Sequence, residues 1–400
     1  MKILMLGWEL PPYNSGGLGV ACYELAKALA GHGAEIDFVL PAEAQHDNPE
    51  FMHVMNALPC ESLPDAREVD LATALASKDP YTHSYDAVRR TQEHYKLFVE
   101  QYIAEHKPHV IHANDWLTLE AGAHAKNICG APLIAQVHAT EFDRAGGKRG
   151  NPLIHEIEQH GLLAADHIVA VSKATKRIIM REYGIPADKI EVIHNSHNKL
   201  PPHSTELMEY RYIEMLKNEG YTVVATIGRL TIQKGLSHFL RAAAKAYSRH
   251  SRMVFVLAGN GDQRDELIRL SADLGISDAV LFPGFVRGKA WRDMYNLADV
   301  FVMSSVSEPF GLTALEAAQH NTAISLTNQS GVSEVLQNVL RYDYWDEDRL
   351  ADQLIALTSS NALKDELARN AALEVAGMSW ASVAKQFMHK YTMAVEGVRR

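Results

Sequence analysis

The sequence of 400 residues is poor in cysteine and has no long apolar run. Its cysteines, Cys22, Cys60 and Cys129, lack the spacing of a metal-binding set, and a sparse, odd number of thiols fits a reducing cytoplasm. The apolar run that ends at Gly7 is too short for a signal-peptide core, and no run approaches the roughly 20 residues of a membrane helix. These absences predict a cytoplasmic protein without a transmembrane segment.

Several sequence motifs that would indicate a cofactor or a metal are also missing. Walker A, H-E-x-x-H and G-x-S-x-G do not occur. Neither "NSGGLG" nor "GNGD" at residues 259–262 has the G-x-G-x-x-G spacing, so no dinucleotide is indicated and "GNGD" predicts only a turn at a strand end. The 39 basic residues against 49 acidic ones give a net charge of −10, which argues against a nucleic-acid partner.

The pattern of the chain is that of a two-domain α/β protein. A length of 400 residues exceeds one ordinary core, and short apolar strands alternate with helical segments in both halves. We expect two Rossmann-like domains, at 1–196 and 197–377, and a terminal helix at 378–400, with a linker near Pro201 and Pro202. The expected strands are at 2–7, 36–41, 109–115, 132–141 and 167–173, then at 222–230, 253–259, 279–285, 300–305 and 322–327. Residues 42–80 are rich in Pro and Asp and predict a surface loop.

The stretch "SEPFGLTALEAA" brings two carboxylates to the start of a helix. Glu308 precedes a proline and should be extended, while Glu316 lies early in the helix that follows. The first N–H groups of that helix, at Gly311, Leu312 and Thr313, favour a phosphate. Carboxylates accept hydrogen bonds from hydroxyls, so a nucleotide sugar would use both features. The alternative is an amphipathic helix with two solvated glutamates.

Two further loops at strand ends carry candidate ligand contacts. "GRLTIQKG" places Arg229 and Lys234 where they could neutralise a diphosphate, although they could also be solvated surface charges. "NSGGLG" follows the first strand, and its glycines, Gly16 and Gly17, let the backbone approach a ligand at the start of a helix.

Two histidines and one acidic motif remain ambiguous. His112 and His138 each end a strand, where an imidazole can contact a sugar hydroxyl. The alternative, above all for His112, is a hydrogen-bonded core histidine. "DED" at 346–348 matches the D-x-D pattern of metal-dependent sugar-nucleotide enzymes. It lies far from the strand ends, and Asp346 is better interpreted as a helix N-cap.

Taken together, these motifs resemble the family-4 retaining glycosyltransferases of the GT-B fold, including the glycogen-synthase-like members. "EPFGLTALE" resembles the E-x7-E motif, "GRLTIQKG" the phosphate loop and "GGLG" the N-terminal glycine loop. "HANDW", "VHATEFDR" and "FPGF" follow in the family order. "HNSH" at 194–197 departs from the usual H-N-G-V, with Ser196 in place of a glycine. The resemblance implies two domains that face a central cleft.

The resemblance also implies a role for each candidate residue. Glu308 would contact the hydroxyls of the transferred sugar, and Glu316 the nucleotide ribose. Arg229 and Lys234 would hold the diphosphate, and His138 would contact the sugar near the reacting carbon. Gly17 would approach the diphosphate from the first domain, and the backbone at Val286 would meet the base. Gly16 and the helix-start residues Gly311, Leu312 and Thr313 complete the predicted substrate-binding set.

The expected activity is transfer of a hexose, glucose above all, from a UDP- or ADP-sugar to an acceptor hydroxyl, with no metal or other cofactor. The acceptor could be an α-glucan, a lipid-linked sugar or a small molecule. A nucleotide-sugar 2-epimerase of the same fold is the main alternative, and a non-catalytic sugar-binding protein is a third. Retention by front-face attack is favoured over a double displacement. The sequence does not indicate an oligomeric state.

Overall fold

A computed structural model describes residues 1–12, 14, 16–41, 49–57, 84–198 and 208–398. The chain divides into two compact units: unit 1 comprises 1–142, 148–195 and 379–400, and unit 2 comprises 143–147 and 196–378. The linker prolines, Pro201 and Pro202, lie outside the described residues.

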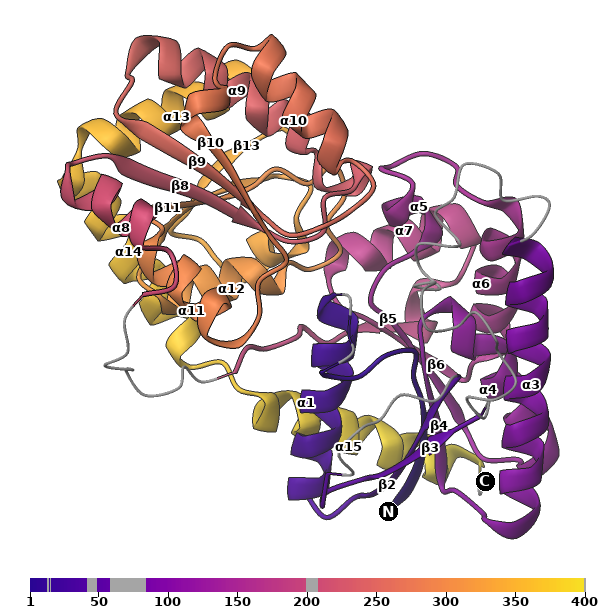
Figure 1. The fold of residues 1–400 in the computed structure, drawn as a ribbon. Coiled ribbons are helices and arrows are strands. Elements are labelled where there is room, and N and C mark those ends of the chain that lie inside the picture. The colour runs from indigo at the N-terminus through magenta and orange to yellow at the C-terminus, as the bar shows by residue number, and fades with distance from the viewer. Residues whose placement is uncertain (13, 15, 42–48, 58–83, 199–207, 399–400) are drawn as a thin grey trace. The chain divides into compact units, whose positions relative to one another are not determined.

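Unit 1 is built on a parallel sheet of order β3-β2-β1-β4-β5-β6-β7 (Figure 1). Its strands are β1 (Lys2–Leu6), β2 (Glu35–Leu40), β3 (His53–Asn56), β4 (Val110–Asn114), β5 (Leu133–Val137), β6 (His167–Ala170) and β7 (Ile190–Val192). Its helices are α1 (Gly17–Gly31), α3 (Ser84–Glu105), α4 (Trp116–Cys129), α6 (Pro152–Ala164), α7 (Lys173–Tyr183) and α15 (Trp380–Val398). The short helix α5 (Glu141–Arg144) lies where the chain passes from unit 1 to unit 2. Every residue of β4 and β5 is buried, as continuous apolar strands covered on both faces require.

The helices of unit 1 cover both faces of this sheet. Helix α1 packs against α15, while α4 packs against α3 and α6, and Figure 1 shows these two groups on opposite sides of the strands. The terminal helix predicted from the sequence is therefore present, and it contributes to the core of unit 1.

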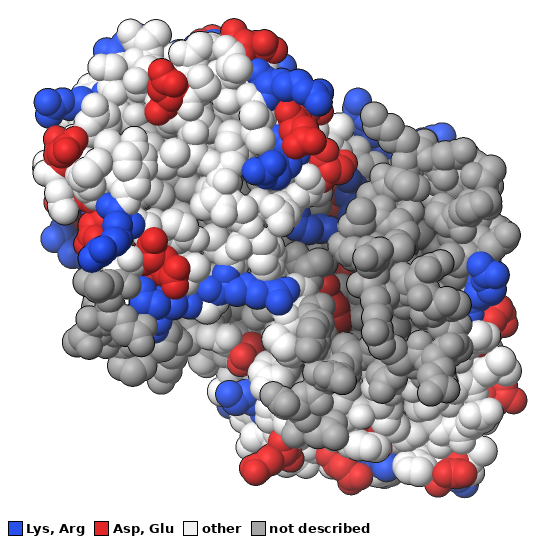
Figure 2. Space-filling model, viewed as in Figure 1, with Lys and Arg blue, Asp and Glu red and all other residues white. Residues whose placement is uncertain are grey.

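Unit 2 repeats the architecture with a parallel sheet of order β10-β9-β8-β11-β12-β13. Its strands are β8 (Thr222–Ile227), β9 (Met253–Ala258), β10 (Val280–Gly284), β11 (Val300–Met303), β12 (Ala323–Thr327) and β13 (Leu340–Tyr342). Its helices are α8 (Arg211–Asn218), α9 (Leu236–Arg249), α10 (Arg264–Asp273), α11 (Gly288–Leu297), α12 (Leu312–Gln319), α13 (Glu347–Ser359) and α14 (Asn361–Ala376). Acidic and basic side chains are interspersed on the face of this unit that Figure 2 shows.

Three strands were not predicted. β3 falls within 42–80, where the sequence predicts an irregular loop, and that prediction is wrong for His53–Asn56. Most of the remaining stretch lies outside the described residues. β7 and β13 have three residues each, too few for a recognisable apolar run. None of the helices in the described ranges has the length and apolar character to cross a membrane.

Candidate functional site

A pocket in unit 2 lies at the carboxyl ends of β8 and β11, which are neighbours in the sheet. Ligands of open parallel sheets bind at this edge. Most of the polar side chains that line the pocket follow β8 or β11: Arg229 and Lys234 come from the loop after β8, and Ser304, Ser305 and Glu308 from the segment between β11 and α12. Thr226 of β8 and Thr313 in the first turn of α12 also line it.

The most prominent contact of the pocket is an ion pair between Lys234 and Glu308. The Lys234 ammonium donates to Glu308 Oε2 at 2.5 Å, and the side chains are only 24% and 10% exposed. Ser305 donates a second hydrogen bond to the same oxygen at 2.8 Å. An ammonium has three donors, so Lys234 can hold Glu308 and still contact a phosphate. The sequence assigns these two residues to different parts of a ligand, and the structure joins them.

The two loops are locked together by hydrogen bonds. Ser304 Oγ donates to the carbonyl of Lys234 at 2.8 Å, and the Val306 N–H donates to the carbonyl of Gln233 at 2.9 Å. The Gln233 amide in turn donates to the carbonyl of Ser307 at 3.0 Å. Because the backbones on both sides of the ion pair are fixed, the position of Lys234 relative to Glu308 is fixed as well.

Glycines allow the strand-end loops to approach this closely. Gly235 has φ +59°, and a Cβ at this position would lie 2.2 Å from the carbonyl oxygen of Ser304. Gly259 of the "GNGD" turn has φ +146°, and its Cβ would lie 1.8 Å from the oxygen of Gly228. Any side chain at either position would push the loops apart. The "GNGD" turn therefore supports the loop that carries Arg229.

The start of α12 faces the same pocket. Glu308 is extended, as its position before a proline predicts, and it forms a parallel bridge with Ser330. Gly311, at φ +112°, is the N-cap, and the helix begins at Leu312. Thr313 of the first turn lines the pocket. The first N–H groups of a helix have no partner within it, so this end is suited to an anion.

Glu316 has partners that the sequence did not indicate. Tyr295 of α11 donates its hydroxyl to Glu316 Oε2 at 2.8 Å, and Trp291 also donates to the carboxylate. Burial raises the pKa of Glu316 to about 7, and the two hydrogen bonds only partly oppose this effect. The second carboxylate of the motif is thus held by α11, in a partly buried position.

Val286 follows β10 at the same edge of the sheet. It is buried, and the N–H of Gly259 at the end of β9 donates to the carbonyl of Gly284 at 2.8 Å. The ends of β10, β9, β8 and β11 therefore follow one another in the order of the sheet. Val286, the phosphate-loop residues and Glu308 all lie along this edge of unit 2.

The remaining predicted residues belong to unit 1. Gly16 is the extended N-cap of α1, which begins at Gly17. Asn14 donates to the carbonyl of Gly16 at 2.8 Å, and Glu9 accepts the N–H of Gly19 at 3.2 Å. The glycine loop is therefore held by side chains from its own turn, and Glu9 is a residue of this loop that the sequence did not single out.

His138 lies directly after β5 in unit 1. Its N–H donates to Asp115 Oδ1 at 2.7 Å, and its Nε2 lies 3.2 Å from Asn114 Oδ1. Burial lowers the pKa of His138 to about 3, with a smaller contribution from His112, so the ring is neutral at physiological pH. Asn114 ends β4 and Asp115 follows it, and neither was predicted as a site residue, although both belong to the "HANDW" stretch of the family resemblance.

His112, by contrast, is a core residue. It is fully buried, its Nδ1 lies 2.5 Å from the Tyr391 hydroxyl, and its ring stacks on Phe387 at 5.4 Å. Both aromatic residues belong to α15. The structure therefore favours the interpretation of His112 as a core residue. Its side chain anchors the terminal helix to β4.

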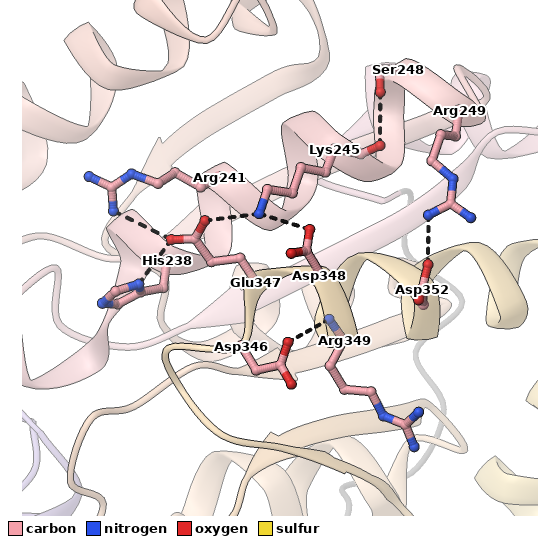
Figure 3. Close-up of polar contacts among 10 residues, drawn as sticks. All are labelled: His238, Arg241, Lys245, Ser248, Arg249, Asp346, Glu347, Asp348, Arg349 and Asp352. Atoms are coloured by element: carbon pink, nitrogen blue, oxygen red, sulfur yellow. Dashed lines mark hydrogen bonds and ion pairs between the residues drawn. The ribbon is translucent and has the colours of Figure 1, made fainter.

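The D-x-D motif is part of a helix start. Asp346 is the N-cap of α13 and accepts the N–H of Arg349 at 3.0 Å, as the sequence predicts (Figure 3). Glu347 accepts from His238 at 3.1 Å, and Lys245 of α9 contacts Asp348 at 2.9 Å. Within the described ranges, no three His, Cys, Asp or Glu side chains are placed to hold a metal ion.

Two family models match this chain in succession. Residues 15–198 match the model for Glycosyltransferase Family 4, and residues 213–374 match the model for glycosyl transferases group 1. An uncharacterized glycosyltransferase of Methanocaldococcus jannaschii is 30% identical over the whole of both chains. A glycogen synthase of Mycobacterium tuberculosis is 25% identical over 84% of this chain and 80% of that one.

The fold comparison agrees with the sequence matches. The Anabaena protein HepE, solved in complex with UDP-glucose, superposes with a TM-score of 0.72 at 20% identity, covering 98% of this chain and 100% of that one. The predicted fold class, with two Rossmann-like domains built on parallel sheets, is confirmed. The chain belongs to the family-4 glycosyltransferases of the GT-B fold.

Proposed function

We propose that the protein is a retaining hexosyltransferase that moves glucose from UDP- or ADP-glucose to an acceptor hydroxyl, with an α-glucan as the first acceptor to test. The observation that carries the proposal is the cluster of Lys234, Glu308 and Ser305 beside the start of α12. It combines a cation and helix N–H groups for a phosphate with a carboxylate for sugar hydroxyls. A related glycogen synthase and the UDP-glucose complex of HepE support the choice of donor and acceptor.

The proposed chemistry breaks the bond between the sugar C1 and the phosphate oxygen, and the electron pair leaves with the diphosphate. Arg229, Lys234 and the first N–H groups of α12 stabilise this developing charge. The acceptor oxygen forms the new bond to C1 from the same face, and its proton passes to the departing phosphate. The configuration at C1 is therefore retained without a covalent intermediate on the protein.

Other residues of the proposal bind and orient the donor. Glu308 accepts hydrogen bonds from the sugar hydroxyls, and its pairing with Lys234 ties the sugar to the diphosphate. Glu316 accepts from the ribose hydroxyls, and the backbone at Val286 contacts the base. His138 contacts the sugar near C1. Gly16 and Gly17 allow the backbone to approach the donor, while Gly311, Leu312 and Thr313 supply the helix start.

We also propose that no metal is required. The positive charge that a divalent cation would supply to the diphosphate comes from Arg229 and Lys234. The acidic residues of the D-x-D motif are engaged in capping α13 and in ion pairs with α9 (Figure 3).

The test is an assay with UDP-glucose and ADP-glucose, each with maltooligosaccharides or without an acceptor. The product mass and its anomeric configuration by NMR report on the transfer. A maltooligosaccharide longer by one hexose, with an α linkage, supports the proposal, and Glu308→Gln should abolish it. Interconversion of the donor at C2 with no change in mass would identify an epimerase instead. Transfer with inversion would refute the mechanism.

A further inference from the structure

Asn114, the last residue of β4, joins the ends of three neighbouring strands. Its side chain is fully buried. Its Nδ2 donates to the backbone carbonyl of Leu6, at the end of β1, at 3.0 Å. Its Oδ1 lies 3.2 Å from Nε2 of His138, which follows β5. The sheet order β1-β4-β5 is what places Asn114 between the other two residues.

The orientation of the Asn114 amide follows from the chemistry of its first partner. A backbone carbonyl can only accept a hydrogen bond, so the NH₂ group of Asn114 must face Leu6. The amide oxygen must then face the imidazole. This oxygen also can only accept, so Nε2 of His138 must carry the hydrogen.

We propose that Asn114 is a positioning residue that holds His138 as the Nε2–H tautomer, so that Nδ1 presents a lone pair to a hydroxyl of the sugar donor. A neutral ring has one donor and one acceptor nitrogen, and fixing the donor fixes the acceptor. The low pKa that burial gives His138 keeps the ring neutral. The neutral ring of His138 can therefore accept a hydrogen bond at Nδ1, and it carries no positive charge.

The backbone next to His138 is fixed by the same strand end. Asp115 Oδ1 accepts the N–H of His138 at 2.7 Å and that of Ala139 at 3.3 Å. Asp115 itself has φ +58°, a strained value for a residue with a side chain. Asn114 thus orients the ring of His138, and Asp115 fixes the main chain that carries it. Both contacts are needed to hold a hydrogen-bond acceptor in place before the ligand binds.

The role of His138 toward the sugar rests on the proposed function, whereas its tautomer does not. We would label histidine with ¹⁵N and record the ring signals, assigning His138 by its loss in His138→Gln. The wild type should show a pyrrole-type Nε2, a pyridine-type Nδ1 and an Nε2 proton that exchanges slowly with water. In Asn114→Leu, this proton should exchange quickly and the Nδ1–H tautomer should appear. Asn114→Asp keeps an acceptor and adds a charge, so it should keep Nε2–H and raise the pKa of His138.

Kinetics would then connect the tautomer to catalysis. Asn114→Leu should lower kcat/KM for transfer by about 5- to 30-fold, the loss expected for one buried hydrogen bond. Ile111→Val on the same strand is the control for lost stability, and it should leave both the NMR signals and the kinetics unchanged. An Nδ1–H tautomer in the wild type, or an Nε2 proton unaffected by Asn114→Leu, would overturn the proposal. Absence of any transfer by the wild type would refute the proposed function. The NMR measurement of the His138 tautomer would then still test whether Asn114 positions the ring.

Discussion

The ion pair between Lys234 and Glu308 gives the sharpest prediction about the pocket. Removing the ammonium with Lys234→Met should have two separate effects. The diphosphate loses a cation, which lowers the rate of transfer. Glu308, with a side chain only 10% exposed, keeps Ser305 as a donor but loses its counter-charge, which lowers the stability of the fold.

The sizes of the two effects follow from the geometry. At 2.5 Å and an effective dielectric constant of about 20, the attraction between two unit charges is ~7 kcal/mol. Desolvation cancels much of this, and Lys234 is 24% exposed, so we expect a net coupling of about 1–3 kcal/mol. Loss of one charge-assisted contact to the leaving group should cost about 2–4 kcal/mol in kcat/KM, or roughly 30- to 1000-fold.

The assay is a double-mutant cycle of Lys234→Met and Glu308→Gln, measured by urea unfolding and by transfer kinetics. Each single variant leaves one charge buried, so the double variant should be less destabilised than the sum of the singles by the coupling energy. Arg229→Ala is the matched control, because Arg229 lines the same pocket. It should lower kcat/KM without any coupling to Glu308→Gln in stability.

Two results would refute this reasoning. Additive losses of stability in the cycle would mean that the ion pair contributes nothing in solution. Near wild-type kcat/KM in a variant that carries both Arg229→Ala and Lys234→Met would mean that the diphosphate binds elsewhere.

Three further predictions concern the surroundings of the pocket. The raised pKa of Glu316 means that the folded state holds a proton more tightly than the unfolded state. The free energy of unfolding should therefore fall as pH rises from about 4.5 to about 7, and Glu316→Gln should remove this dependence in urea titrations. Transfer should survive excess EDTA, and loss of activity on chelation would contradict the proposed metal independence. Asp346→Ala should cost about 1 kcal/mol of stability through the lost N-cap, with no change in kcat. Gly235→Ala should lower Tm and kcat/KM together, because its Cβ would meet the Ser304 carbonyl; an unchanged Tm would show that the loop has room to move.

The sequence by itself determined the fold class and the edge of each sheet that carries the site. Apolar runs separated by helices specify parallel strands, and the residues after each run must lie at the carboxyl edge. The extended Glu308, a helix start near Gly311 and the N-cap at Asp346 were predicted as well, and the helix begins one residue later, at Leu312. Each depends on only a few neighbouring residues, so local chemistry is sufficient. The short strands β7 and β13 and the half-exposed β3 lacked such a signal.

Only the tertiary structure decided which side chains meet. Lys234 and Glu308 lie 74 positions apart and are joined because β8 and β11 are neighbours in the sheet. The contact between Asn114 and His138 likewise depends on the order of the strands, and the raised pKa of Glu316 depends on its burial beside Tyr295. A sequence pattern identifies residues that can hold a charge or a hydrogen bond. Their protonation states and partners are set by packing, because desolvation and hydrogen-bond geometry exist only once distant segments are brought together.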